Sequence, residues 1–120
     1  MPDNGNIGVG TANPTDLLTV AGKIGAREIK VSTSAGADFV FETGYKLPEL
    51  AELEKFVKTN KHLPEIPTAK QMVENGVNLG ELNIKLLQKV EELTFHLIEK
   101  DKTIEGILKR MDEMERKVKK

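Results

Sequence analysis

The chain has 120 residues, of which 38% are hydrophobic and 4% aromatic, with a net charge of −1 and no cysteine. This length holds one domain or two small units that share a core. The balanced charge argues against a broad nucleic-acid or membrane surface, and the lack of cysteine excludes disulfides and thiolate metal sites. No apolar run is long enough to span a membrane, so we expect no membrane insertion. The start carries no signal-peptide pattern, and we expect a piece of a longer chain.

Residues 1–36 are rich in Gly, Asn, Thr and Ala. Short apolar alternations, separated by turn-forming pairs such as Asn13-Pro14, predict short strands. The predicted strands lie at residues 7–9, 18–20, 24 and 29–31. Because they are too short to form an independent sheet, we expect a strand-rich shaft in which three chains complete one another. A flexible linker is the alternative interpretation.

Residues 37–78 form the second predicted region, a small α/β connector packed on the final helix. Residues 37–45 hold three of the five aromatic residues of the chain. Alternation along an extended strand would place Phe39 and Phe41 on one face and Val40 on the other. We expect this segment to anchor the connector on the final helix.

Apolar residues at helical spacing predict a helix over 48–60, with Pro48 in its first turn. Two prolines then make residues 61–67 an extended loop. Leu63 and Ile66 are the apolar residues of this loop, and we expect both to be buried.

Thr68 and Gln71 have the spacing of a capping box. They predict a second, short helix that ends at Gly76. Met72 and Val73 are its apolar residues, and we expect them to face inward.

The third predicted region, residues 79–120, is a long helix that follows an N-cap at Asn78. It carries a seven-residue repeat in which ten of the twelve a and d positions are apolar. The a positions are Asn83, Val90, Leu97, Ile104, Met111 and Val118, and the d positions are Leu79, Leu86, Leu93, Lys100, Ile107 and Met114. These twelve residues are called the seam below. A strict seven-residue period predicts a left-handed coiled coil. Since the chain has no second helix of matching length, we expect the partner to be another copy of the same chain.

A second apolar stripe flanks the seam in the first half of this helix only. Its members are Ile84, Leu87, Phe95 and Ile98. We expect the helix over 48–57, together with Phe39 and Phe41, to cover this stripe. After residue 98 only Leu108 continues it, so the second half is predicted to be a bare coiled coil.

The polar residues of the same helix fall into two groups: Lys100 in the seam, which allows two interpretations, and the carboxylates outside the seam. Lys100 replaces an apolar d residue; its stem either extends out of the seam or sets register and oligomer state at some cost in stability. The remaining carboxylates lie beside lysines and predict a solvated, ion-paired surface. They are Glu91, Glu92, Glu99, Asp101 and Glu105.

The glycine-rich start carries a recognisable motif. It reads Asn4-Gly5-Asn6-Ile7-Gly8-Val9-Gly10-Thr11, then Asn13-Pro14, then Leu18-Thr19-Val20-Ala21-Gly22-Lys23-Ile24. This run resembles an element of phage-type tail fibres and bacterial fibre-like surface proteins, where it precedes a C-terminal trimerisation and intramolecular-chaperone domain.

The rest of the chain resembles the compact C-terminal domain of such proteins from Bacteroidetes-type bacteria and their phages. The matching runs are Asp38-Phe39-Val40-Phe41, Tyr45-Lys46-Leu47, Glu54-Lys55-Phe56-Val57, Asn60-Lys61-His62-Leu63-Pro64-Glu65-Ile66-Pro67, Gly76-Val77-Asn78-Leu79-Gly80 and Leu86-Leu87-Gln88-Lys89-Val90-Glu91-Glu92-Leu93-Thr94. The resemblance covers nearly the whole chain. It implies a trimeric, extended fibre end that is extracellular or part of a virion or tail-like particle.

A larger relative of that family, the endosialidase-type chaperone domain, releases itself with a serine nucleophile. Ser32 and Ser34 are the only serines in this chain. Neither is followed by the Asp and basic residues that the resemblance implies for a self-cleavage site, so we do not expect autoproteolysis.

Few residues suggest other chemistry, and we predict no catalytic residue, metal or cofactor. His62 is expected to make a structural hydrogen bond, and His96, at a g position, to be a solvated flank residue. Gly5, Gly8 and Gly10 lack the spacing of a phosphate-binding loop and are interpreted as fibre turns.

Three functions therefore remain open. The first is a structural assembly module at the C-terminal end of a fibre, which drives homotrimerisation and chain registration for the upstream shaft. The second is a receptor-binding tip that recognises a cell-surface molecule, and the third is an autoprocessing peptidase. The seam mixes dimer-favouring layers (Val90 with Leu93) and layers that favour higher states (Ile104 with Ile107). The family resemblance favours an α+β fold whose long helix forms a parallel homotrimeric coiled coil.

Overall fold

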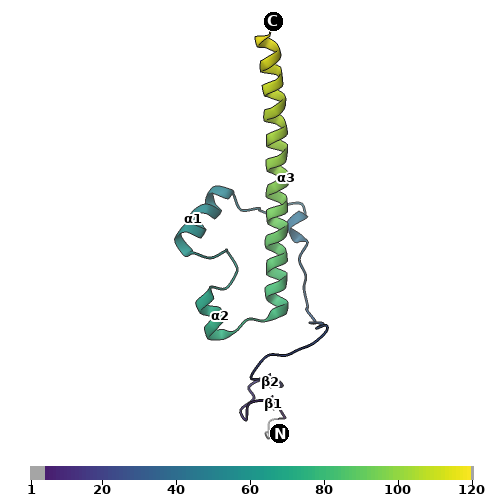
Figure 1. The fold of residues 1–120 in the computed structure, drawn as a ribbon, viewed down its shortest axis with the longest axis vertical. Coiled ribbons are helices and arrows are strands. Elements are labelled where there is room, and N and C mark those ends of the chain that lie inside the picture. The colour runs from purple at the N-terminus through teal and green to yellow at the C-terminus, as the bar shows by residue number, and fades with distance from the viewer. Residues whose placement is uncertain (1–4, 120) are drawn as a thin grey trace. The chain divides into compact units, whose positions relative to one another are not determined.

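The computed structural model describes residues 5–119. The chain divides into two compact units between Lys30 and Val31. The first unit holds two short strands, and the second holds three α-helices and one 3-10 turn (Figure 1). The predicted mixture of helix with short strands, dominated by a long C-terminal helix, is confirmed.

The first unit is built on two parallel strands, β1 (Ile7–Val9) and β2 (Leu18–Val20). Ile7 pairs with Leu18 and Val9 with Val20. The strands predicted at 7–9 and 18–20 are therefore confirmed. Their parallel direction is unusual, because parallel strands ordinarily need a crossover of about a dozen residues, and here only residues 10–17 join them.

Side-chain hydrogen bonds and one glycine close this short crossover. Asn6 Nδ2 donates to the carbonyl of Pro14 at 3.3 Å. The hydroxyl of Thr19 accepts the backbone N–H groups of Thr15 and Asp16 at 3.1 and 3.0 Å. Gly10 has a φ of +76°, and a Cβ on it would lie 3.3 Å from the backbone oxygen of Ala21, the residue after β2. Local polar bonds and the buried Pro14 therefore hold the crossover.

The strands predicted at residue 24 and over 29–31 are not formed. Ile24 and Ile29 are 64% and 63% exposed. A strand needs a neighbour to satisfy its backbone groups, and a single chain supplies none for these residues.

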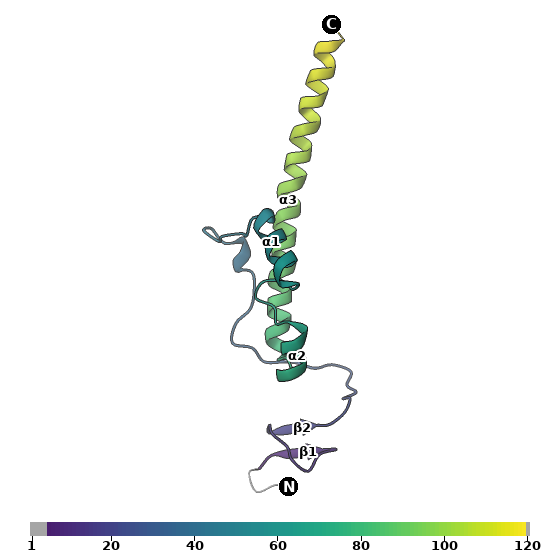
Figure 2. The ribbon, with the colours of Figure 1, turned by 90° about the vertical axis from the view of Figure 1, so that its left-hand side faces the viewer.

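The second unit contains η1 (Phe39–Phe41), α1 (Leu50–Asn60), α2 (Ala69–Asn75) and α3 (Leu79–Val118). With 40 residues, α3 is about 60 Å long at 1.5 Å per residue. In both ribbon views its second half has no other described segment beside it (Figures 1 and 2).

Residues 39–41 form a 3-10 turn, so the predicted strand is wrong. Asp38, with a φ of +77°, turns the chain just before it. The turn buries Val40 to 1% exposure. Among residues 5–119 the other buried apolar side chain is Pro14, in the first unit. Phe41 stacks on Phe95 of α3, with ring centroids 6.4 Å apart. The segment thus does anchor the connector on α3, as expected, but as a turn.

Helix ends follow the sequence closely. In α2 the predicted capping box is present: the Thr68 hydroxyl accepts the Gln71 N–H at 3.1 Å, and the Gln71 side chain accepts the Thr68 N–H at 2.9 Å. Gly76 ends this helix with a φ of +70°. α1 begins at Leu50, two residues later than predicted, with Pro48 just outside it.

Burial in the connector differs from expectation. Val73 is 87% exposed and Leu63 46% exposed, so the predictions that they face inward are wrong, whereas Met72 and Ile66 are half-buried. Both errors have one cause: short amphipathic segments bury a face only where another element lies against it, and none lies against these two side chains.

The predicted cover of the second apolar stripe is half right. η1 contacts α3, but no Cα of α1 lies within 8 Å of a Cα of α3, and α1 stands to one side in Figure 1. Phe95 and Ile84 are half-buried, while Leu87 and Ile98 stay 47% and 48% exposed. α1 therefore leaves these two residues of the stripe uncovered.

Candidate assembly surface on α3

All twelve seam residues lie on α3 and are exposed to solvent. The ten apolar ones are between 43% and 85% exposed. They are Leu79, Leu86, Val90, Leu93, Leu97, Ile104, Ile107, Met111, Met114 and Val118. A seven-residue repeat keeps these side chains on one stripe of the helix. The structure therefore leaves an apolar stripe, interrupted at Asn83 and Lys100, uncovered along the length of α3.

The buried residues of α3 are polar or lack a side chain. They are Gly80, Gln88, Glu91 and Glu92. In the heptad numbering Gln88 occupies f, the position farthest from the seam, and Glu91 and Glu92 occupy b and c. Around these three residues the rest of the unit thus packs on the side of α3 that faces away from the seam. This is the reverse of an ordinary amphipathic helix, which buries its apolar stripe against its own chain. In the first turn the segment at Val31 and Thr33 crosses at Gly80, an e position beside the seam.

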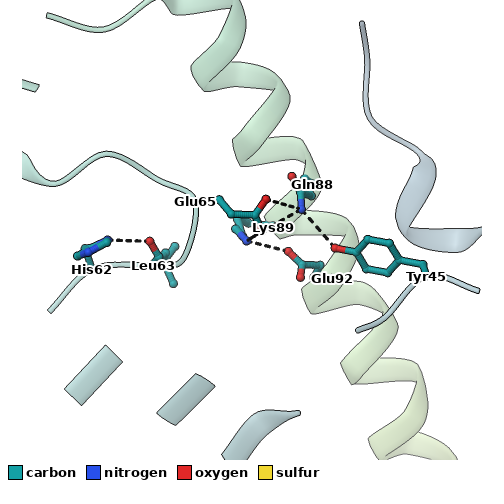
Figure 3. A network of polar contacts seen from close by, with 7 residues as sticks. All are labelled: Tyr45, His62, Leu63, Glu65, Gln88, Lys89 and Glu92. Atoms are coloured by element: carbon teal, nitrogen blue, oxygen red, sulfur yellow. Dashed lines mark hydrogen bonds and ion pairs between the residues drawn. The ribbon is translucent and has the colours of Figure 1, made fainter. Parts of the chain in front are cut away.

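A polar network fixes the connector to that outer side (Figure 3). Gln88 Nε2 donates to the hydroxyl of Tyr45 and to Glu65 Oε1, both at 3.3 Å. Lys89 Nζ pairs with Glu65 Oε1 at 3.1 Å and with Glu92 Oε1 at 3.0 Å. These five residues are called the polar clamp below. The clamp ties the loops before and after α1 to one turn of α3.

The carboxylates of the polar clamp stabilise the charged form of the Lys89 side chain. This side chain is only 12% exposed, and burial lowers the pKa of an ammonium group. The carboxylates of Glu92 and Glu65 together outweigh this effect, so the pKa of Lys89 is raised above 10.5. Next to the clamp, both carboxylate oxygens of Glu91 accept the backbone N–H of Asp38 at 3.0 Å. Burial raises the pKa of Glu91, and this outweighs the lowering by that N–H.

The interpretation of Glu91 and Glu92 as solvated residues is wrong, because they are 6% and 5% exposed. The sequence does contain a signal for their burial, because both residues lie between Gln88 and Phe95, on the half of the helix that is expected to be covered. Where apolar residues on one side of a helix are covered, the polar residues between them are covered too. Glu99, Asp101 and Glu105 are exposed as predicted, but within residues 5–119 none of them forms a predicted ion pair.

The two histidines differ. His62 Nδ1 lies 2.8 Å from the carbonyl of Leu63 and, when protonated, donates to it (Figure 3); its ring meets Phe56 edge-on at 5.4 Å. This agrees with the predicted structural role. His96 was expected to be solvated, but it is half-buried, and its Nε2 is buried without a hydrogen-bond partner in the part of the chain that the structure describes. The expectation for His96 is therefore wrong, since its g position lies close to the covered side of α3.

A groove of about 530 Å³ opens where the segment from Val31 to Ala35 crosses the first turns of α3. It contains Ser32 and Ser34 and is also lined by Glu81 and Lys85. Within residues 5–119 neither serine hydroxyl makes a hydrogen bond and no histidine lines the groove. Neither serine hydroxyl is therefore hydrogen-bonded to Glu81 or Lys85, the titratable side chains that line the groove with them.

Other features of the described chain bear on ligands and membranes. No three His, Cys, Asp or Glu side chains within residues 5–119 gather closely enough to hold a metal ion. None of the described helices is long and apolar enough to cross a membrane.

Comparison of the chain with protein-family models, with curated proteins and with solved structures gives no match. The resemblance to fibre-end domains, and the absence of a cofactor or of catalysis, stay predictions.

Proposed function

We propose that this chain is a structural assembly module at the end of a fibre protein, in which three copies join through a parallel coiled coil of α3. One observation carries the proposal: the apolar seam residues are exposed along α3, while beyond the first turn the rest of the unit packs on the opposite side of the helix. A second copy can therefore reach the seam without displacing the connector.

Magnitudes favour the seam as the main source of association energy. Burying a large apolar side chain contributes about 1.5–3 kcal/mol, so covering the exposed half of each contributes about 1 kcal/mol, at ten positions per chain. A solvent-exposed ion pair contributes at most about 1 kcal/mol. Polar contacts alone would not hold copies together, whereas the seam can.

The trimeric state rests on further support. The strands of the first unit expose Ile7, Val9 and Leu18 by 46%, 54% and 57%. Apolar residues on so small a sheet gain cover when chains wrap around one another. Together with the family resemblance, this favours three chains over two.

In the proposed mechanism, α3 associates before the strands of different chains pair. Helical contacts are local and form fast, whereas pairing between strands of different chains is non-local and slow. Assembly of α3 first brings the glycine-rich segments of three chains together at an effective concentration of about millimolar. The module would then act as a folding clamp for the shaft on an extracellular fibre or a virion, and not as a catalyst.

Sedimentation equilibrium tests the proposal on the unmodified chain and on Leu93→Asp and Leu97→Asp. We expect a trimer mass at micromolar concentration for the unmodified chain and a monomer mass for both variants, because each places a charge in a dry seam. Val73→Asp is the matched control: Val73 is also an exposed apolar residue, but it lies on α2 and should leave the trimer intact. A monomer mass for the unmodified chain would contradict the proposal.

A further inference from the structure

The two flanks of the seam differ in charge. The g positions border the seam on one side and are Leu82, Lys89, His96, Thr103, Arg110 and Lys117. The e positions border it on the other side and are Gly80, Leu87, Thr94, Asp101, Leu108 and Glu115. Every cationic side chain of the two sets is at g, and every carboxylate is at e. The seam is therefore bordered by one basic and one acidic flank.

The charged flank residues in the second half of α3 are available to a second molecule. Asp101, Arg110 and Glu115 are exposed, and none of them forms an ion pair within residues 5–119. Lys89 differs, because the polar clamp already holds its ammonium. The free charges thus lie where the chain leaves the helix bare.

Chain direction decides which flank residues meet. In a parallel coiled coil, a g residue faces the e residue five positions later in the neighbouring helix. This would pair Arg110 with Glu115 of the second copy and His96 with its Asp101, and among the e and g residues it brings no two like charges together. The same arrangement places the Lys100 side chains of the copies in one d layer. In an antiparallel pair, g faces g and e faces e, so the basic flank would face itself.

Lys100 fits the same arrangement. It occupies a d position and is exposed between Leu97 and Ile104. The hole that receives a d side chain in a parallel coiled coil includes the e residue of the facing helix. Lys100 of one copy would therefore meet Asp101 of the next copy, which gives its ammonium a counter-charge at the edge of the seam.

We propose that these charged flanks select a second copy in parallel orientation, with Arg110–Glu115 and Lys100–Asp101 as the ion pairs between copies. The inference rests on the proposed assembly function and assigns the residues that give it direction. The seam supplies attraction that depends little on direction, whereas the flanks make the antiparallel arrangement repulsive.

Disulfide trapping measures the direction, because the chain has no cysteine of its own. Val118→Cys and Leu79→Cys chains are mixed and oxidised under native conditions. We expect cross-links of 118 to 118 and of 79 to 79, and none of 118 to 79. Abundant 118-to-79 cross-links would overturn the inference.

Charge reversal measures the role of the flanks. Arg110→Glu should weaken the trimer association constant by roughly tenfold to a hundredfold at low salt, since three attractive contacts become repulsive. Lys109→Glu, an exposed neighbour at f with the same change in charge, should have little effect. Adding Glu115→Arg to Arg110→Glu should restore the affinity, and the effect should shrink at high salt.

The outcomes separate the two proposals. A monomeric unmodified chain removes the assembly function and this inference together. A trimer in which Arg110→Glu and Lys109→Glu weaken association equally, or in which the double reversal does not restore it, removes this inference alone.

Discussion

At the residue scale, Gly80 marks a close approach between the first turn of α3 and the segment that precedes η1. A Cβ at this position would lie 2.8 Å from Val31 Cγ1 and 3.0 Å from Thr33 Cγ2. Both neighbours are β-branched and have little rotamer freedom. The glycine is thus what lets the segment cross the helix.

We expect Gly80→Ala to be less stable than Gly106→Ala by about 1–3 kcal/mol. Both replace a helical glycine and gain about 1 kcal/mol of helix propensity, but Gly106 has no atom within 4 Å of its Cβ position, whereas Gly80→Ala must push Val31 aside. Chemical denaturation of the two variants at equal chain concentration gives the difference. Equal stabilities would show that the 31–33 segment does not hold to α3 in solution.

Lys89 carries the pH dependence of the polar clamp. Its folded-state pKa is raised above 10.5 by Glu92 and Glu65, which outweigh burial. The stability it contributes is therefore fully present below 10.5 and is lost as pH rises through the raised folded-state pKa. We expect Lys89→Met to cost about 1–3 kcal/mol at pH 8 and progressively less above pH 10.5.

Unfolding free energies of the unmodified chain and of Lys89→Met, measured side by side from pH 8 to pH 12, isolate this group, because the other lysines titrate in both. Lys58→Met is the control, since the Lys58–Glu54 pair is exposed on both sides. A gap between the unmodified chain and Lys89→Met that stays constant with pH would show that the clamp ion pairs do not contribute.

At the element scale, α3 has two halves with different support. The first half is held by η1 and the polar clamp, and the second half, after residue 98, contacts no other described element. Helices in proteins gain most of their stability from the packing of one face, and short helices without such packing are marginal in water. The second half should therefore be helical only when a partner covers its seam.

We expect the helical circular dichroism at 222 nm to fall on dilution, in step with the dissociation of the trimer. In Leu93→Asp the signal should be lower and should not depend on concentration. Sedimentation velocity over the same dilution series reports the assembly. A helical signal that stays constant while the mass falls to that of a monomer would mean that α3 is stable without a partner.

At the scale of the whole molecule, the proposed assembly predicts that β1 and β2 depend on the association of α3. The first unit is held by one pair of three-residue strands and by local polar bonds, with its apolar residues largely exposed. It has too little buried area to be stable alone. We expect Leu93→Asp to raise amide hydrogen exchange at residues 7–9 and 18–20 as well as in α3.

A transplant tests the same dependence in the other direction. Replacing residues 79–120 by an unrelated trimeric coiled coil should restore protection of the strands at least in part, because it again raises the local concentration of shaft segments. Deletion of 79–120 without replacement should leave them unprotected. Full protection of these strands in the deleted chain would show that they fold without α3, and the proposed role of α3 in assembling the strands would be mistaken.

The elements that sequence reasoning found correctly are those set by neighbours in the chain. The capping box of Thr68 and Gln71, the start of α3 after Asn78, and strands at 7–9 and 18–20 depend on residues a few positions apart. The seam belongs to the same class, because a seven-residue period is a property of one helix. The turn at 39–41 was missed, since its conformation follows from Asp38 and from the packing of Phe41 on Phe95, which lie far apart in sequence.

The amino-acid sequence by itself determined where α3 runs and which of its residues form an apolar stripe, because helix periodicity and caps are local. Only the tertiary structure decided which side of α3 its own chain covers. The connector lies on the polar side, where Gln88, Glu91 and Glu92 find hydrogen-bond partners on Tyr45, Asp38 and Glu65 or an ion pair with Lys89. Periodicity cannot foresee this, because burial of a charged residue becomes favourable only when a distant segment brings it a partner.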